Sequence, residues 1–257
     1  MNRFAPFGDR VWTIAHRGAS RDRPENTLVA FDEALRQGCD AIELDLQLTR
    51  DGAVVVFHDL TLARAGGGRR SLRSIDRAGL VSLGLAVPTL DEVLERYSGP
   101  TWLLLEIKQT RTERALDEIV RQTVDAVARY GARERVFLLS FDRAALERSA
   151  DLDPGLRRVL NVGGRDPVDR FPAAFAGLHA VSVDVRALRP PLLAAVEAAR
   201  LPLLVFTCNQ TGEVERALAA GAAGVMSDRP GWLRGYLAAR SAAGDGASVA
   251  CGDRPIE

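Results

Sequence analysis

Two carboxylates, Glu43 and Asp45, stand two positions apart in the run Ala41–Leu48, AIELDLQL. Apolar and polar residues alternate along this run, which predicts a strand whose two acids point to the same side. Carboxylates on one strand face repel each other unless a positive group lies between them. Because oxygen ligands at this spacing suit a hard divalent cation such as Mg²⁺ or Ca²⁺, the pattern predicts a metal site.

A histidine is expected beside these acids because the chain should turn back on itself. Asp51-Gly52 is typical of a two-residue hairpin turn, and residues 53–57 again have a strand-like pattern. Counting outward from that turn sets Asp45 opposite His58, at a distance of about 5 Å. A bulge would shift the pairing by one residue and would still leave His58 near the acids.

Further polar residues are expected at the ends of two other strands. His16 and Arg17 follow the first predicted strand, and Glu106 and Lys108 share one face of a later one. If these strands are parallel, their ends lie at the same face of the fold. Three carboxylates, two histidines, an arginine and a lysine would then meet.

Each of these residues also has an ordinary structural explanation. The pair Glu106 and Lys108, taken alone, fits a solvated surface pair better than a site. His58, which precedes Asp59, could equally be a structural histidine held by its neighbour. The paired acids of Ala41–Leu48 are harder to explain, because a buried unpaired carboxylate is costly or shifts its pKa. The coincidence of all these residues favours a functional site.

The composition is that of an ordinary globular protein. Of its 257 residues, 47% are hydrophobic and 26% are charged, enough to bury a sizeable core. The 34 basic and 34 acidic residues balance, so no overall field attracts nucleic acid or an anionic membrane. Three cysteines argue against a disulfide framework and for a reducing compartment. The sequence shows neither a signal peptide nor an integral membrane segment, so we expect a cytoplasmic protein.

Strand and helix patterns alternate along the chain and predict eight strand–helix units, the second with an added hairpin strand. The predicted strands cover Ala41–Leu48 with 53–57, Trp102–Ile107, Val136–Ser140, 11–15, 157–161, 180–183, 203–207 and 224–226. The predicted helices cover 25–37, 89–97, 113–130, 143–150, 167–175, 190–199, 213–220 and 230–239.

Eight alternating units predict one closed α/β barrel, the (β/α)8 or TIM-barrel fold. Alternation implies a parallel sheet with right-handed crossovers, and eight units favour closure over an open doubly wound sheet. The first strand is not followed by the Gly-x-Gly-x-x-Gly pattern of dinucleotide-binding folds. We expect a single domain over residues 1–240 and a disordered tail over 241–257, which is rich in Gly, Ala, Ser and Asp.

Several short motifs occur in a characteristic order along the chain. They are His16-Arg17-Gly18, Pro24-Glu25-Asn26-Thr27, Glu43-x-Asp45, Thr49-x-Asp51-Gly52, His58-Asp59, Pro88-Thr89-Leu90, Glu106-x-Lys108, Ser140-Phe141, Thr207-x-Asn209 and Gly224 through Ser227-Asp228-Arg229-Pro230. In order and spacing they closely resemble the motifs of the glycerophosphodiester phosphodiesterases. The resemblance runs from about His16 to about Trp232.

The resemblance implies a metal-dependent TIM barrel of lipid and glycerol metabolism. Such an enzyme hydrolyses small glycerophosphodiesters to glycerol 3-phosphate and an alcohol such as choline or ethanolamine. The residues that it implies are Glu43, Asp45 and Glu106 for a divalent ion (Mg²⁺ or Ca²⁺), His16 and His58 as general acid and base, and Arg17 and Lys108 for the phosphate. Either histidine could be the acid. This chemistry agrees with the residue patterns, since a diester anion resists attack until cations neutralise its oxygens.

The chain departs from the family pattern at two places. Phe206 stands where the family commonly has a tryptophan, so we expect it to form part of the substrate pocket and to influence which alcohol fits. Members often carry a larger inserted loop with Arg-Thr-Thr near its start, whereas here Arg64 precedes Ala65-Gly66-Gly67.

Other functions are compatible with the same residues. The enzyme could act on a lysophospholipid, or the substrate's own glycerol hydroxyl could attack phosphorus and leave a cyclic phosphate. A non-catalytic barrel could bind a phosphorylated ligand through Arg17, Lys108 and the ion. A nuclease is disfavoured, because the sequence has no basic patch with interleaved aromatic residues. We therefore expect a small-molecule substrate and no nucleic-acid partner.

Overall fold

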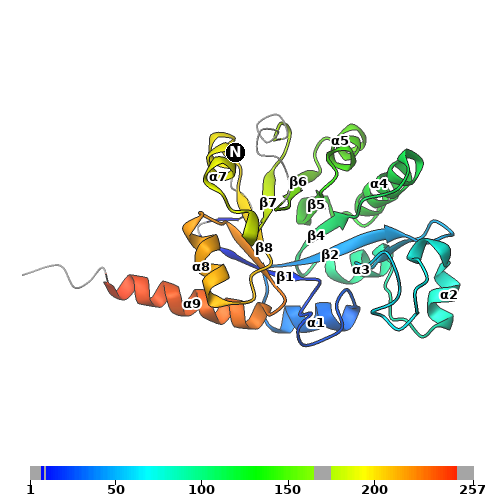
Figure 1. Cartoon of the computed structure of the whole chain (residues 1–257), viewed down its shortest axis with the longest axis horizontal. Coiled ribbons are helices and arrows are strands. Elements are labelled where there is room, and N and C mark those ends of the chain that lie inside the picture. The colour runs from blue at the N-terminus through cyan, green and yellow to red at the C-terminus, as the bar shows by residue number, and fades with distance from the viewer. Residues whose placement is uncertain (1–6, 9, 165–174, 248–257) are drawn as a thin grey trace, which may run out of the picture.

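The computed structural model describes residues 7, 8, 10–164 and 175–247. Its parallel strands are β1 (Trp12–His16), β2 (Ala41–Leu48), β4 (Trp102–Ile107), β5 (Val136–Ser140), β6 (Arg157–Val162), β7 (Ala180–Asp184), β8 (Leu203–Phe206) and β9 (Gly224–Ser227). They lie in the order β1-β9-β8-β7-β6-β5-β4-β2, and pairing of β1 with β2 closes the ring (Figure 1). The predicted single-domain (β/α)8 barrel is confirmed.

Helices follow the strands and cover the outside of the barrel. They are α1 (Leu28–Arg36), α2 (Arg77–Ser82), α3 (Leu90–Tyr97), α4 (Glu113–Arg129), α5 (Arg143–Leu152), α7 (Pro190–Ala198), α8 (Thr211–Ala219) and α9 (Pro230–Ala247), with short 3-10 turns at Leu72–Ser74, Arg133–Arg135 and Val185–Ala187. Most boundaries lie within a few residues of the prediction. The predicted helix 167–175 falls, except for its last residue, outside the described part of the chain.

The last helix is longer than its sequence pattern predicts. Helix α9 was expected to end near residue 239 but continues to Ala247, into the segment predicted as a tail. The rest of that segment, 248–257, lies outside the described residues. In the part of the chain that the structure describes, no helix has both the length and the apolar content of a membrane span.

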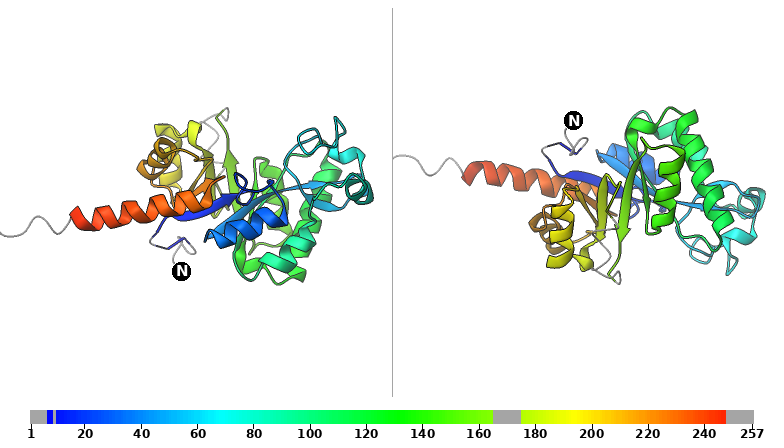
Figure 2. Two further views of the ribbon diagram at one scale, coloured as in Figure 1. Left: turned by 90° about the horizontal axis from the view of Figure 1, so that it is seen from below. Right: turned by 90° about the horizontal axis from the view of Figure 1, so that it is seen from above.

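A short helix in the segment between β3 (Val54–Val56) and α3 was not predicted. The segment reads as a Gly- and Arg-rich loop, but helix α2 forms in it after Asp76, whose carboxylate accepts a hydrogen bond from Gly79 N at 2.8 Å. A small separate core holds the segment together, made by Val55, Leu62, Leu72, Leu80 and Val87. Figure 2 shows α2 at one end of the molecule and the far end of α9 at the other.

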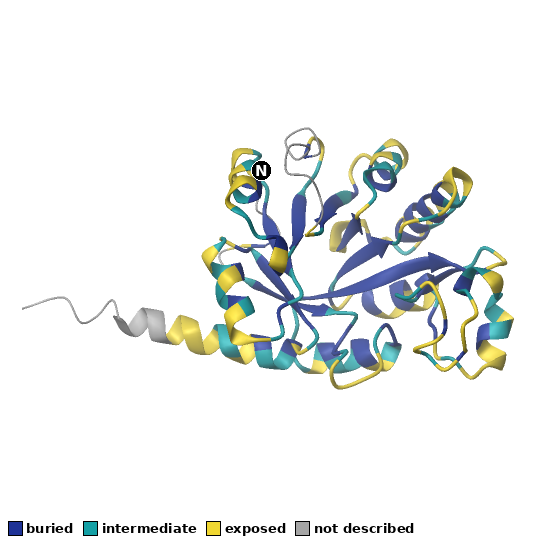
Figure 3. Cartoon of the chain, in the orientation of Figure 1, coloured by how far each residue is buried: buried dark blue, intermediate teal, exposed yellow. Residues whose placement is uncertain are grey.

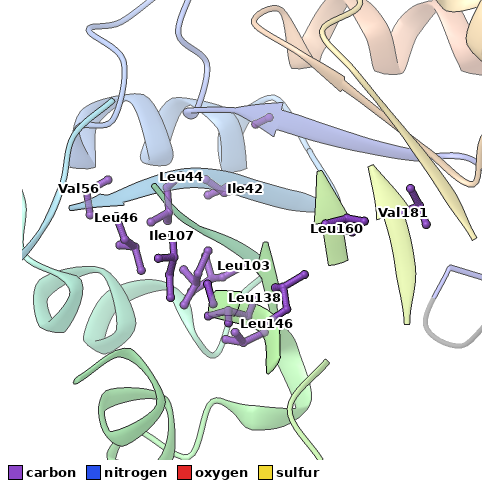
Figure 4. Packing of buried hydrophobic residues seen from close by; sticks show 14 of the residues in the cluster. Ile42, Leu44, Leu46, Val56, Leu103, Ile107, Leu138, Leu146, Leu160 and Val181 are labelled. Atoms are coloured by element: carbon purple, nitrogen blue, oxygen red, sulfur yellow. The ribbon is translucent and has the colours of Figure 1, made fainter. Parts of the chain in front are cut away.

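The barrel has two apolar layers, one outside the strands and one inside them. Outward residues of the strands, such as Leu44, Leu103 and Leu138, pack against the helices (Figure 4), and the strands are buried almost throughout (Figure 3). The inner layer consists of Phe7, Trp12, Ile14, Ala41, Leu104, Phe137, Leu139, Val159, Ala180, Leu204 and Met226. Further along the same strands the inward positions become polar, and these positions form the site.

The hairpin after β2 has a different register from the predicted one. Leu46 pairs with Val56, so Asp45 lies opposite Phe57 rather than His58, and the prediction is wrong by one residue. The loop contains three residues, 50–52, instead of the predicted two, because Thr49 rather than Arg50 pairs with Ala53. Gly52 has a φ of 81°, the left-handed conformation that ends a three-residue hairpin loop. His58 nevertheless stays at the barrel mouth.

The outer layer supplies a prediction on stability. Leu103 is completely buried between the barrel and its helices, so Leu103→Ala is expected to lower the free energy of unfolding by about 2–5 kcal/mol. Val81 is 60% exposed, and Val81→Ala should change that free energy by about 0.5 kcal/mol or less. Urea unfolding followed by circular dichroism measures both, and equal effects would contradict this description of the core.

Candidate active site

Parallel pairing places the polar side chains of neighbouring strands at the same height in the barrel. Asp45 on β2 is in register with Glu106 on β4, and His16 on β1 is in register with Glu43 on β2. Lys108 follows β4, and its backbone N–H donates to the carbonyl of Leu46 at 3.2 Å. The C-terminal ends of these strands therefore bring the sequence-predicted residues together, as is usual for this fold.

Three carboxylates form the base of the site. Glu43, Asp45 and Glu106 are buried, and each has an oxygen within 4.8 Å of an oxygen of the other two. Burial and the charge of Asp45 raise the pKa of Glu43. Burial also raises the pKa of Glu106, although nearby Lys108 opposes this shift. Three buried acids this close together therefore disfavour one another's ionisation.

Asp45 stays ionised because it is surrounded by donors. Burial alone would raise the pKa of Asp45, but Lys108 and Arg17 lower it below its ordinary value. Lys108 Nζ lies 3.2 Å from Asp45 Oδ1 and 2.6 Å from Glu106 Oε1. Arg17 Nε lies 3.2 Å from Asp45 Oδ2, and Asn26 Nδ2 donates to the same oxygen at 2.7 Å. Asn161 Nδ2 donates to Glu106 Oε2 at 3.1 Å.

The loop after β1 has an unusual backbone that places Arg17 and Asn26. Both residues have a positive φ, 58° and 56°, which is uncommon for side chains other than glycine. Gly18 between them has a φ of 83°, and a Cβ there would lie 2.7 Å from the carbonyl carbon of Ala30. Only glycine fits this close approach of the loop to α1, which explains the His-Arg-Gly sequence.

Each histidine is held by an aspartate through its Nδ1 atom. His16 Nδ1 lies 2.7 Å from Asp228 Oδ1, and His58 Nδ1 lies 2.8 Å from Asp59 Oδ1. A carboxylate can only accept, so Nδ1 carries the proton and Nε2 remains available. In turn, Asn209 Nδ2 donates to Asp228 Oδ2 at 2.6 Å.

The two imidazoles lie in different electrostatic surroundings. Burial lowers the pKa of His16, but the hydrogen bond to Asp228 and the charge of Glu43 outweigh it, so the net shift is upward. Burial lowers the pKa of His58, and the positive charges of Lys108 and Arg17 lower it further. Together they outweigh the negative charge of Asp45, which raises this pKa. Opposite shifts in one site suit a pair of groups that exchange protons in opposite directions.

Several residues of the site had no role assigned from the sequence. Asp228 and Asn209 stand in motifs, but only the structure shows that Asp228 contacts His16 and that Asn209 donates to Asp228. Asn26 likewise belongs to a motif and donates to Asp45. Asn161 carries no sequence signal, because a single asparagine in a strand is ordinary. Asp59 was considered as a partner of His58 and is one.

A cavity of about 400 Å³ at the barrel mouth is lined by charged and polar residues that include His16, Arg17, Glu43, His58, Glu106 and Lys108. Phe141 and Phe206 also line it, their ring centroids 6.0 Å apart and their planes at 89°. Asp184 and Arg186 line the cavity too and are paired at 2.6 Å. The cavity therefore offers both charged groups and aromatic rings to one small molecule.

The buried acids fit a hard divalent cation. Carboxylate oxygens are the ligands that Mg²⁺ and Ca²⁺ prefer, and one oxygen each of Glu43, Asp45 and Glu106 belongs to a cluster within 4.8 Å. Burial and the charge of Asp45 disfavour the ionised form of Glu43. A cation among the three carboxylates would relieve their mutual repulsion.

The family model described as "Glycerophosphoryl diester phosphodiesterase family" matches residues 16–232. The chain belongs to this family. The family predicted from the motifs is confirmed, and with it the prediction of a phosphoric diester hydrolase.

Individual members of the glycerophosphoryl diester phosphodiesterase family resemble the chain over most of its length. A glycerophosphodiester phosphodiesterase of Caldanaerobacter subterraneus is 31% identical over 236 residues, covering 86% of this chain and 95% of that protein. A crystal structure from Silicibacter pomeroyi has a TM-score of 0.82 at 27% identity and covers 90% and 94% of the two chains. A phosphodiesterase of Oleispira antarctica, solved with the product sn-glycerol-3-phosphate, has a TM-score of 0.76 at 26% identity, with coverage of 88% and 95%.

The Asp228 contact yields a prediction on activity. Asp228→Asn removes the charge and allows an amide N–H to face Nδ1 of His16, which favours the wrong tautomer. By analogy with other aspartate–histidine pairs, kcat/KM for a glycerophosphodiester should fall by on the order of 10²- to 10⁴-fold. Asp151→Asn, an exposed change on α5, is the control and should retain activity. Equal activity of both variants would contradict an orienting role for Asp228.

Proposed function

We propose that this protein hydrolyses small glycerophosphodiesters to glycerol 3-phosphate and an alcohol, with a divalent metal ion and two histidines. The observation that carries the proposal is the meeting of three sets of groups in one cavity. These are a buried carboxylate triad, two cations, and two imidazoles that each have an aspartate on Nδ1.

Arg17 and Lys108 are the groups that bind the phosphate. Both line the cavity and both touch the carboxylate triad, so their positions are fixed before substrate arrives. The pKa of Lys108 is raised, because Asp45 and Glu106 outweigh the effect of burial, so the ammonium keeps its proton. Fixed positive charge is what a phosphodiester needs, since its anionic oxygens repel a nucleophile and gain charge in the transition state.

Glu43, Asp45 and Glu106 would hold the metal ion, Mg²⁺ or Ca²⁺. When bound, such an ion would supply Lewis-acid polarisation of a phosphoryl oxygen and lower the pKa of the attacking water. The surrounding donors keep the acids in place. Asn26 and Asn161 each donate to one of them, which orients the carboxylate oxygens that remain.

His16 and His58 would exchange protons with the nucleophile and the leaving group. One Nε2 takes the proton of an attacking water as its oxygen bonds to phosphorus. The other histidine, in its protonated form, gives its proton to the alcohol oxygen as the bond between phosphorus and that oxygen breaks. Water thus supplies one oxygen and two hydrogens to the products, and the enzyme returns to its starting state after the histidines re-equilibrate with solvent.

The two phenylalanines of the cavity would receive the carbon atoms of the substrate. Phe206 and Phe141 both line the cavity, with their rings edge to face. A volume of about 400 Å³ suits a small diester rather than a polymer. The Oleispira antarctica relative was solved with sn-glycerol-3-phosphate as product, which supports glycerol 3-phosphate as a product here.

Removal of metal tests the proposal directly. Protein treated with a chelator is expected to lose at least about 10²-fold of its activity on glycerophosphocholine, because the phosphoryl oxygen would lose its Lewis-acid polarisation. Adding back Mg²⁺, Ca²⁺ or Mn²⁺ should restore it, but not in Asp45→Asn. Phosphorus NMR identifies the product as glycerol 3-phosphate or a cyclic phosphate, and lysophospholipids are tested as substrates alongside. Activity that is insensitive to the chelator would contradict the metal-dependent mechanism.

Leaving-group chemistry tests the histidine roles and separates acid from base. His16→Ala and His58→Ala should each lower hydrolysis of an alkyl diester by about 10²- to 10⁴-fold. An aryl diester such as a p-nitrophenyl ester needs no proton on its leaving oxygen, so one variant should recover most of its activity and thereby identify the general acid. The third histidine of the chain, His179, lies outside the cavity, and His179→Ala is the control. Full activity of both site variants would favour a role without proton transfer.

A further inference from the structure

A chain of alternating charges runs along one edge of the cavity and connects two of its groups. It begins at Asp59, continues through Arg64 and Glu25, and ends at Arg17. Asp59 also contacts His58, so the chain has a site residue at each end. None of the functions described above requires Arg64, which lies outside the cavity lining.

Arg64 holds both carboxylates of this chain at once. Its Nε donates to Asp59 Oδ2 at 2.5 Å and its Nη2 to Asp59 Oδ1 at 2.9 Å, a two-point contact. Nη2 also donates to Glu25 Oε1 at 2.6 Å, and Nη1 to Glu25 Oε2 at 3.3 Å. Only a planar guanidinium offers enough donors in one plane to hold two carboxylates in this way.

Each of these carboxylates also contacts a residue that lines the cavity. Asp59 Oδ1, the oxygen that Nη2 of Arg64 contacts, also receives Nδ1 of His58 at 2.8 Å. Glu25 Oε1 similarly accepts from Arg64 and, at 3.2 Å, from Nη1 of Arg17. One oxygen of each carboxylate is thus shared between Arg64 and a cavity residue.

We propose that Arg64 is a positioning residue that fixes the orientations of His58 and Arg17 together. The proposal rests on the roles given to those two residues in the proposed function. Arg64 reaches the site from the outer segment between β3 and α3, and its side chain is 59% exposed. This outer segment departs from the family pattern directly after Arg64. Arg64 nevertheless connects the segment to His58 and Arg17.

Stability alone is a poor explanation for this arrangement. Exposed ion pairs contribute little to stability, because water screens them and the side chains lose conformational freedom. Geometry is what the contacts specify: two two-point hydrogen-bonded pairs on one guanidinium. The hydrogen bond from Arg64 lowers the pKa of Asp59 to about 2, so this carboxylate remains an acceptor for His58 at any working pH.

The orientation of His58 can be measured without any substrate. With ¹⁵N-labelled histidine, the ring nitrogens of the three histidines of the chain report tautomer and hydrogen bonding, and His58→Gln assigns the signal. In Arg64→Ala, the His58 signal should change from the Nδ1–H form to a mixture of tautomers. His16 is the internal control and should keep its Nδ1–H tautomer, because its Nδ1 contacts Asp228 rather than a carboxylate that Arg64 holds. An unchanged His58 signal would overturn the proposal.

Kinetics provide the second measurement. Arg64→Ala is expected to lower kcat by about 10- to 100-fold with an unchanged unfolding midpoint, since small misplacements of catalytic groups cost that much. Arg64→Lys should recover only part, because one ammonium cannot hold both carboxylates. Guanidinium ion added to Arg64→Ala should restore activity, as the position is open to solvent. Arg70→Ala, an exposed arginine of the same segment, is the matched control.

The outcomes separate this proposal from the proposed function. If wild-type protein hydrolyses no glycerophosphodiester, the proposed function fails, while the NMR result still decides whether Arg64 orients His58. If wild-type protein is active and Arg64→Ala matches it in kcat, the proposed function stands and the positioning role is wrong. A lower kcat that guanidinium does not restore, together with a lowered unfolding midpoint, would assign Arg64 a purely structural role and overturn the proposal.

Discussion

Three carboxylates buried at one mouth of a barrel are the constraint on which the rest of the site depends. Like charges in a medium of low polarity repel strongly, and each would otherwise take up a proton. Arg17, Lys108 and Asn26 lower the pKa of Asp45, whereas burial and the charge of Asp45 raise the pKa of Glu43. A divalent cation among the three carboxylates would relieve the repulsion between them.

The barrel makes such a concentration of charge possible. Inward side chains on the strands are apolar for most of the barrel's depth, from Trp12 and Leu104 to Phe137, and provide the stability that a polar mouth does not. The same strands then continue into polar positions at their C-terminal ends. Since eight strands converge there, groups from β1, β2, β4 and β9 meet although they are far apart in the sequence.

The two histidines are held by the same device in two parts of the chain. Asp228 follows the last strand and Asp59 follows the hairpin, yet both accept from Nδ1 and leave Nε2 toward the cavity. Their supports differ. Asp228 is held by Asn209 within the barrel, whereas Asp59 is held by Arg64 from the outer segment. The outer segment thus reaches His58 through Asp59 and Arg17 through Glu25.

Local patterns in the sequence determined which elements form and which faces their acids share. Alternation placed Glu43 with Asp45 and Glu106 with Lys108, and the count of strand–helix units determined the barrel, because both follow from short-range periodicity. The hairpin register was wrong by one residue, since the left-handed conformation of Gly52 in a three-residue loop was not distinguished from a two-residue turn. Only the closed barrel decided that Asp228 holds His16 and Asn161 holds Glu106, because such contacts join positions whose separation along the chain carries no local signal.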